Sequence, residues 1–153
     1  KKFKLNYLGK DKELKKINKI CKNAIIGVGQ IKDYKKRSKI FNYLKKLKFS
    51  LPAIKSPFSH VSKKSFVQEG SIVMHGAIIN SGAKIGKNCI INTKALIEHD
   101  ATVKDHCHIS TGAIINGDVE IGDYSFIGSG SVIKNGLKLN KKSFIKMGSK
   151  VKK

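Results

Sequence analysis

A six-residue period of branched aliphatic residues runs through most of this chain and constrains its fold more than any other feature. From Val61 to Val151, sixteen consecutive positions spaced six apart hold Val, Ile or Leu. Four residues after them runs a second register, in which thirteen of fifteen positions hold Ser, Ala or Cys. Hexapeptide repeats of this kind form parallel β-helices. The aliphatic positions are Val61, Val67, Val73, Ile79, Ile85, Ile91, Ile97, Val103, Ile109, Ile115, Ile121, Ile127, Ile133, Leu139, Ile145 and Val151.

The repeat also predicts where the side chains point. Each hexapeptide should form one short strand and a turn, so three of them close a triangular coil with the aliphatic residue inside and the small residue at the corner. Residues three hexapeptides apart then stack at the spacing of neighbouring strands, roughly 4.8 Å. A coil has no core of its own and buries its aliphatic residues only against its neighbours. We therefore predict a mainly β protein with a parallel β-helix over residues 56–153.

Residues 1–55 lack this period and predict a partial, Rossmann-like α/β domain. Alternating strands and helices are typical of a parallel sheet covered by helices, and five elements amount to half of a nucleotide-binding fold. The expected elements are a strand within residues 1–10, a helix from Asp11 to about Cys21, a strand from Asn23 to Gly29, a helix from Asp33 to about Lys48 and a strand from Phe49 to Ile54.

The Gly27-Val28-Gly29 turn in this region has two interpretations. Glycines let a ligand approach the backbone closely, but they also suit an ordinary turn between a strand and a helix. No G-x-G-x-x-G fingerprint follows, so a dinucleotide site is not predicted.

The net charge of +22 is concentrated in residues 1–60, which carry +15 of it. Such an excess attracts polyanions, or it reflects a lysine-rich surface without a specific partner. Nucleic-acid readers rely on arginine forks and stacking aromatic residues, and Arg37 is the only arginine, so no nucleic-acid partner is predicted. The sequence has neither a signal peptide nor an apolar run long enough to cross a bilayer, which predicts a cytoplasmic protein without a membrane span. The first residue is Lys1 rather than Met, which suggests a truncated or processed chain.

The cysteines and histidines do not form a metal-ligand pattern. Cys89 and Cys107 lie three hexapeptides apart in the small-residue register, so they should stack in adjacent coils as packing residues in a reducing compartment. Hexapeptide carbonic anhydrases bind zinc through histidines separated by about 36 and then five residues, and neither separation occurs here. We therefore predict no metal site.

His99 is the strongest candidate for chemistry, because Glu98 and Asp100 flank it on both sides. A carboxylate bound to one imidazole nitrogen fixes the tautomer and increases the basicity of the other nitrogen, as a general base requires. His108 follows nine residues later, which is half a coil and therefore another face of the prism. Both histidines can serve one site only if that site lies between subunits of a cyclic oligomer, for which a homotrimer is the simplest arrangement.

The motif I-E-H-D-A-T-V-K-D-H-C-H-I-S-T-G-A, followed by G-D-V-E-I-G-D-Y-S-F-I-G-S-G-S, resembles a known family within residues 56–134. This family is the sialic acid O-acetyltransferase group of hexapeptide-repeat enzymes, which includes the UDP-4-amino-sugar N-acetyltransferases of bacterial surface-glycan synthesis. The resemblance implies a left-handed β-helix. It also implies that residues 1–55 are the second half of a sugar-nucleotide-binding domain whose opening strand and Gly-rich loop are missing.

The resemblance further implies roles for individual residues. His99 matches the general base and Asp100 the acid that increases its basicity. His108 matches a histidine that contacts acetyl-CoA, Ser129 a backbone position that lines the coenzyme channel between subunits, and Gly29 a turn facing the substrate. The implied function is acetyl-CoA-dependent N-acetylation of an amino-sugar nucleotide. The alternatives are O-acetylation of sialic acid and a trimeric scaffold that has lost catalysis.

Overall fold

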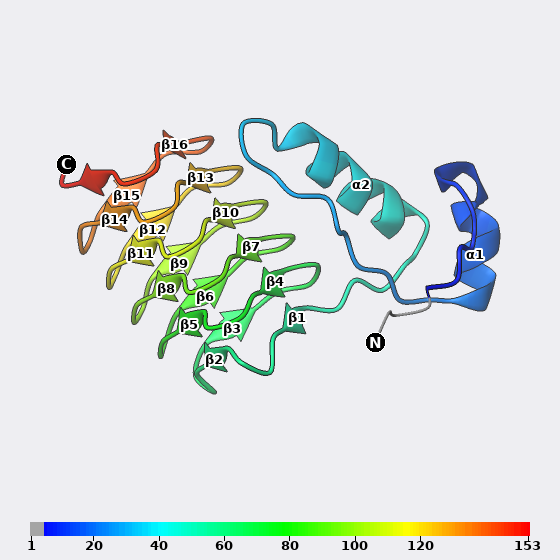
Figure 1. Ribbon diagram of the computed structural model, residues 1–153, viewed down its shortest axis with the longest axis horizontal. Coiled ribbons are helices and arrows are strands. Elements are labelled where there is room, and N and C mark those ends of the chain that lie inside the picture. The colour runs from blue at the N-terminus through cyan, green and yellow to red at the C-terminus, as the bar shows by residue number, and fades with distance from the viewer. Residues whose placement is uncertain (1–4) are drawn as a thin grey trace.

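The computed structural model describes residues 5–153. It consists of a triangular parallel β-helix, called the prism below, with a small helical unit along one edge (Figure 1). All strands of the prism are two residues long and pair in parallel. They are β1 (Ile54–Lys55), β2 (His60–Val61), β3 (Phe66–Val67), β4 (Ile72–Val73), β5 (Ile78–Ile79), β6 (Lys84–Ile85), β7 (Ile90–Ile91), β8 (Leu96–Ile97), β9 (Thr102–Val103), β10 (His108–Ile109), β11 (Ile114–Ile115), β12 (Glu120–Ile121), β13 (Phe126–Ile127), β14 (Val132–Ile133), β15 (Lys138–Leu139), β16 (Phe144–Ile145) and β17 (Lys150–Val151).

Every third strand belongs to the same sheet, so the prism has three faces. Face 1 contains β1, β4, β7, β10, β13 and β16; face 2 contains β2, β5, β8, β11, β14 and β17; face 3 contains β3, β6, β9, β12 and β15. Strand partners lie three hexapeptides apart throughout, as where His108 pairs with Ile90 below and Phe126 above. This register confirms the predicted parallel β-helix. Its first strand, β1, lies just before the predicted boundary at residue 56.

The interior of the prism is made of the two predicted registers. Its buried cluster contains only Val, Ile, Ala and Cys, and Ile97, Ile109 and Ile115 have no exposed surface. Aliphatic residues of the end coils, such as Val61 and Val151, are only half-buried because each end coil has a neighbour on one side. Cys89 and Cys107 belong to this cluster, which confirms their prediction as packing residues.

The N-terminal unit contains the two predicted helices but not the predicted sheet. A 3-10 turn, η1 (Asp11–Glu13), leads into α1 (Leu14–Ile20), and α2 (Lys35–Lys46) follows. The Asp33 carboxylate accepts the N–H of Lys35, the first residue of α2, at 2.8 Å, and the N-cap position itself is Tyr34. Residues 5–10 form no strand, and Phe3, which supported that prediction, lies outside the described residues.

The predicted strands from Asn23 to Gly29 and from Phe49 to Ile54 pair only through one parallel bridge, between Asn23 and Ser50. The physical reason lies in the partners that the extended backbone finds after residue 24. The carbonyls of Ile26 and Val28 accept hydrogen bonds from the Arg37 guanidinium at 2.7 and 2.8 Å. A side chain thus satisfies this backbone in place of a neighbouring strand.

Helix α2 packs along the corner between face 3 and face 1 (Figure 1). The Phe41 and His106 rings form a T-shaped pair with centroids 5.4 Å apart. Gly70 is needed at this corner, because a Cβ there would lie 2.7 Å from the Phe41 ring. Arg37 reaches the same corner with further hydrogen bonds to the carbonyls of Gly70 at 3.3 Å and Asn88 at 3.4 Å. The helix is therefore fixed to the prism by packing and by a buried arginine.

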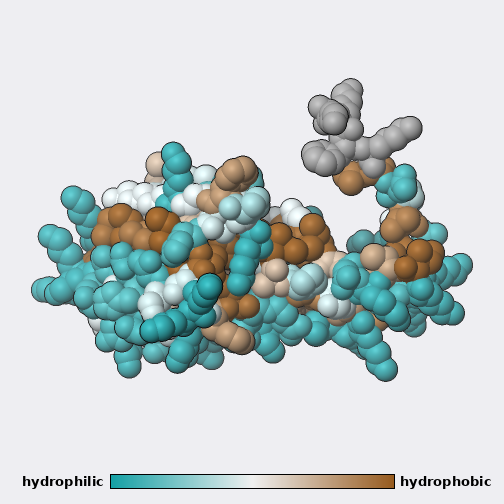
Figure 2. All heavy atoms as spheres, turned by 90° about the horizontal axis from the view of Figure 1, so that it is seen from below, coloured by the Kyte–Doolittle hydropathy of each residue, from teal (hydrophilic) through white to brown (hydrophobic). Residues whose placement is uncertain are grey.

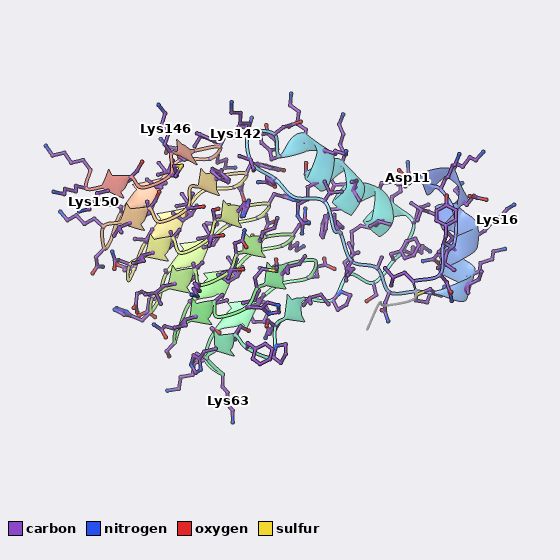
Figure 3. All side chains as sticks on the ribbon, viewed as in Figure 1. Asp11, Lys16, Lys63, Lys142, Lys146 and Lys150 are labelled. Atoms are coloured by element: carbon purple, nitrogen blue, oxygen red, sulfur yellow. The ribbon has the colours of Figure 1, made fainter. Side chains whose placement is uncertain are left out.

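The surface is dominated by lysine side chains. Lys146 and Lys150 project outward from the C-terminal coils and Lys16 from α1 (Figure 3). Hydrophobic atoms reach the surface of the prism between these hydrophilic side chains (Figure 2). Within residues 5–153, no helix combines the length and apolar character that crossing a bilayer requires.

Candidate active site

The His99–Asp100 pair lies in the turn between β8 and β9, at the corner between face 2 and face 3. Asp100 adopts a left-handed backbone conformation with φ 60° and turns its carboxylate toward the preceding residue. The His99 Nδ1 lies 3.0 Å from Asp100 Oδ2, and about two thirds of both side chains is exposed. An Nδ1–H donated to Asp100 leaves the lone pair of Nε2 free to accept a proton from a bound molecule.

Only one of the two carboxylates beside His99 contacts the imidazole. Glu98 instead points along face 2, where its Oε2 accepts a hydrogen bond from Asn80 Nδ2 at 2.8 Å. Asn80 lies one coil below Glu98, so their pairing follows from the stacking register of the coils. The imidazole therefore contacts Asp100, and Glu98 lies outside the pair.

His108 occupies a very different environment on face 1. It belongs to β10, is only 6% exposed, and its Nδ1 contacts the main-chain oxygen of Gln30. Because a carbonyl can only accept, Nδ1 carries the proton, and the unprotonated Nε2 accepts a hydrogen bond from Asn92 Nδ2 at 3.1 Å. Burial lowers the pKa of His108, which favours this neutral form.

Two cavities meet at Asn92 and His108. The larger, about 510 Å³, extends over face 1 toward the C-terminal coils. There the hydroxyls of Ser110 and Ser129 lie 2.9 Å apart. The smaller, about 320 Å³, lies between face 1 and the Gly27-Val28-Gly29 segment, so Gly29 does line a cavity. Cβ atoms would meet nothing within 4 Å at Gly27 or Gly29, which leaves this backbone open to a ligand.

Sequence reasoning missed several residues of the larger cavity. Their signal was present in the repeat, because outward residues of one face recur in every third hexapeptide. Steps of 18 residues from His108 reach Phe126 and Phe144, and steps of 18 from Ser110 reach Asn92 one coil back and Lys146 two coils on. The residues missed in this way are Asn92, Ser110, Phe126, Phe144 and Lys146.

The predicted site residues do not all come together within one chain. His99 and Asp100 lie at the corner between face 2 and face 3, whereas His108 and Ser129 lie on face 1 and at its edge. Among residues 5–153, no group of three or more His, Cys, Asp and Glu side chains is placed to hold a metal ion. A hydrogen bond with Cys89 and, to a lesser extent, burial raise the pKa of the Cys107 thiol well above its ordinary value, so this cysteine stays protonated.

Residues 100–135 match the family model of the bacterial transferase hexapeptide (six repeats). The matched segment lies within the prism and runs from the turn between β8 and β9 to the turn after β14. At the level of sequence, no curated protein shows significant similarity to the chain. Solved structures do show similarity, and it extends beyond the hexapeptide domain to the N-terminal unit.

Perosamine N-acetyltransferase from Caulobacter crescentus, crystallised with CoA and GDP-perosamine, superimposes with a TM-score of 0.85 at 26% identity. That match covers 90% of this chain and 65% of the Caulobacter chain. The acetyltransferase domain of PglB from Neisseria gonorrhoeae, crystallised with acetyl coenzyme A, gives a TM-score of 0.75 at 29% identity, covering 77% of this chain and 58% of the Neisseria chain. These similarities confirm the resemblance to the sugar acetyltransferases. The chain spans less than two thirds of the length of either protein.

Proposed function

We propose that this chain is part of an acetyl-CoA-dependent acetyltransferase that N-acetylates a nucleotide-linked amino sugar for bacterial surface glycans. The observation that carries the proposal is the 3.0 Å contact between His99 Nδ1 and Asp100 Oδ2 on an exposed corner of a hexapeptide prism. Support comes from the similarity to structures that hold CoA, acetyl coenzyme A and GDP-perosamine. A bare prism would support only a scaffold, since folds of this kind carry many functions.

The proposed reaction needs one general base. The amine of the sugar attacks the thioester carbonyl of acetyl-CoA, and a C–N bond forms as His99 Nε2 takes a proton from the nitrogen. Asp100 holds the proton on Nδ1 and stabilises the imidazolium that results. Cleavage of the C–S bond then releases the thiolate, which receives the proton from His99. The products are the N-acetyl sugar and coenzyme A with a free thiol.

The coenzyme is proposed to occupy the larger cavity over face 1. Ser110 and Ser129 offer hydroxyls, His108 and Asn92 line the inner end of the cavity, and Lys146 at the outer end offers a positive charge for phosphate. The aromatic rings of Phe126 and Phe144 stack with centroids 5.1 Å apart and supply an apolar floor. This set of groups suits an extended chain with amides and a phosphorylated end. The sugar nucleotide would approach from the side of Gly29.

A second copy of the chain is proposed to complete the site. The outer side of face 2 carries a row of aliphatic residues, one in each coil: Ile78, Leu96, Ile114 and Val132. Ile78 is 40% exposed, and the other three are partly buried. An exposed apolar row of this length typically marks a protein interface. It borders the corner that holds His99, so a neighbouring prism packed there could bring its His108 face toward this base. Three copies would close such a ring as a homotrimer.

The test is an acetyl-transfer assay on the full-length protein. The release of free thiol from acetyl-CoA is followed with a panel of amino-sugar nucleotides, with sialic acid included to detect O-acetylation. We expect turnover with at least one amino-sugar nucleotide and a rate at least about 10²-fold lower in His99→Ala. Binding of acetyl-CoA without turnover on any acceptor would instead favour a scaffold. An unchanged rate in His99→Ala would exclude the proposed base.

A further inference from the structure

The turns between face 2 and face 3 place glycines directly above and below the His99–Asp100 pair. Four dipeptides stack there, one in each successive coil: Ser81-Gly82, His99-Asp100, Gly117-Asp118 and Asn135-Gly136. The backbone joins them, since the Asp100 N–H donates to Ser81 O at 3.0 Å and the Asp118 N–H to His99 O at 3.1 Å. This ladder fixes the spacing between turns, so the space around the pair depends on the neighbouring side chains.

Gly117 lies against the His99 ring. A Cβ at residue 117 would be 2.6 Å from His99 Nε2 and 2.7 Å from Cε1, both much closer than carbon atoms pack. The backbone of Gly117 does not adopt the left-handed conformation, so it can accommodate an alanine without strain. The clash of the added methyl group is therefore with the His99 ring. The nitrogen that faces residue 117 is the one left free to accept a proton.

Gly82 makes the corresponding space below Asp100. A Cβ at residue 82 would overlap Asp100 Oδ1 and lie 3.1 Å from the carboxylate carbon. Gly82 does have a left-handed backbone, with φ +75°, and any side chain there is strained. Gly136 is a control position for this backbone strain. Its φ is also left-handed, at +73°, but a Cβ there would meet no atom within 4 Å.

We propose that Gly117 and Gly82 are positioning residues that hold the His99–Asp100 pair in its geometry. Gly117 leaves room for the Nε2 edge of the imidazole against the next turn. Gly82 lets the Asp100 carboxylate turn back toward Nδ1. This inference rests on His99 as the proposed base, but its central observable is the imidazole itself.

The first test measures the His99 imidazole by ¹⁵N NMR, with the signals assigned by comparison with His99→Ala. In the native protein we expect a proton on Nδ1 and an unprotonated Nε2. In Gly117→Ala the methyl group displaces the ring, so we expect this signature to be replaced by averaged tautomers. Unchanged His99 signals in Gly117→Ala would overturn the proposal whether or not the protein has activity.

A double-mutant cycle separates this effect from a general loss of folding. Gly117→Ala should lower the Tm in the native background and have little effect in His99→Ala, where the ring that meets the methyl group is absent. Equal losses of Tm in both backgrounds would show that the methyl group clashes with something other than His99, and would overturn the proposal.

Activity provides the last comparison. A displacement of about 1 Å in a catalytic group can cost about 10²-fold in rate, so we expect Gly117→Ala to lower kcat by about that factor with a smaller change in KM for acetyl-CoA. Gly82→Ala should lower kcat more than Gly136→Ala, which carries the same backbone strain. Equal effects of these two variants would contradict the role of Gly82. If the native protein transfers no acetyl group, the proposed function fails, while the NMR and Tm measurements still decide the positioning.

Discussion

His108 Nδ1 lies against the main-chain oxygen of Gln30, a residue 78 positions earlier in the chain. The Gln30 side chain is anchored beside it, because its Nε2 donates to His106 O at 2.7 Å. The N-terminal unit thus fixes which nitrogen of a prism histidine carries the proton. Gln30 therefore contacts two buried histidines, His106 through its main-chain oxygen and His108 through its ring.

The burial of these histidines predicts how stability changes with pH. Burial is the main cause that lowers the pKa of His106; Arg37 lowers this pKa further, whereas Asp105 and Asp123 raise it. Burial also lowers the pKa of His108, with a smaller contribution from Arg37, whereas the hydrogen bond with Gln30 raises it. The unfolded chain binds protons near its ordinary histidine pKa of about 6.5, whereas the folded chain does so only at lower pH. We therefore expect the free energy of unfolding to fall as pH decreases from about 7 to 5.

Urea unfolding at a series of pH values measures this effect. His108→Gln keeps a hydrogen-bonding side chain but cannot titrate, so its stability should decrease less steeply over the same interval. A slope equal to that of the native protein would contradict the prediction.

The acid–base pair predicts a graded set of rate losses. General acid–base groups typically contribute about 10² to 10⁴-fold, so His99→Ala should lose about that much in kcat and Asp100→Asn a smaller part of it. Glu98→Gln is the matched control, because Glu98 bonds to Asn80 and does not contact the imidazole. A loss in Glu98→Gln as large as in Asp100→Asn would show that the orienting carboxylate is misassigned.

The placement of His99 and His108 on different parts of the prism predicts complementation between subunits. If one site uses His99 from one copy and His108 from the next, a refolded 1:1 mixture of His99→Ala and His108→Gln chains contains some intact sites. Random assembly of a cyclic trimer restores both residues at about a quarter of the interfaces. The mixture should therefore recover about a quarter of the native rate. A mixture as inactive as either variant alone would argue against a shared site.

The stacked interior predicts unequal costs for two isoleucines on the same face. Ile97 has no exposed surface, and truncation to alanine should cost about 2–5 kcal/mol in the free energy of unfolding. Ile78 points outward and is 40% exposed, so Ile78→Ala should cost much less in an isolated chain. Chemical denaturation at low protein concentration measures both. A cost for Ile78→Ala that grows with protein concentration would support the proposed subunit interface on face 2. A cost as large as that of Ile97→Ala at low protein concentration would contradict the prediction.

Arg37 predicts how firmly the N-terminal unit is attached. Its guanidinium serves four carbonyls, those of Ile26, Val28, Gly70 and Asn88. Lysine keeps the charge but not the fork of donors. Arg37→Lys leaves buried carbonyls without partners and should cost roughly 3 kcal/mol.

Limited proteolysis provides a second measurement, because the segment from residue 26 to residue 30 should become accessible in Arg37→Lys. Lys36→Met, at an exposed neighbouring position of α2, is the control and should leave both measurements close to the native values. Equal protection of the segment in Arg37→Lys would mean that other contacts hold it.

The prism was predictable because its information is local and repeated. One aliphatic and one small residue in every six determine the strands, the inward positions and the stacking register, and the observed pairing from β1 to β17 follows it. The same register placed Cys89 and Cys107 in the core and His99 and His108 on different parts of the prism. Helices α1 and α2 were predictable from the helical spacing of their apolar residues.

Three features needed the tertiary structure. The α/β layer was expected from the order of its elements, but the carbonyls of Ile26 and Val28 accept hydrogen bonds from Arg37 instead of from a neighbouring strand. The spacing of residues in the sequence does not predict this contact. The choice of Asp100 over Glu98 depends on a left-handed turn and on Asn80 one coil away. The tautomer of His108 depends on Gln30, far away in the chain. A repeat specifies where its own side chains point, whereas the proton on an imidazole is decided by whichever distant atom the fold brings against it.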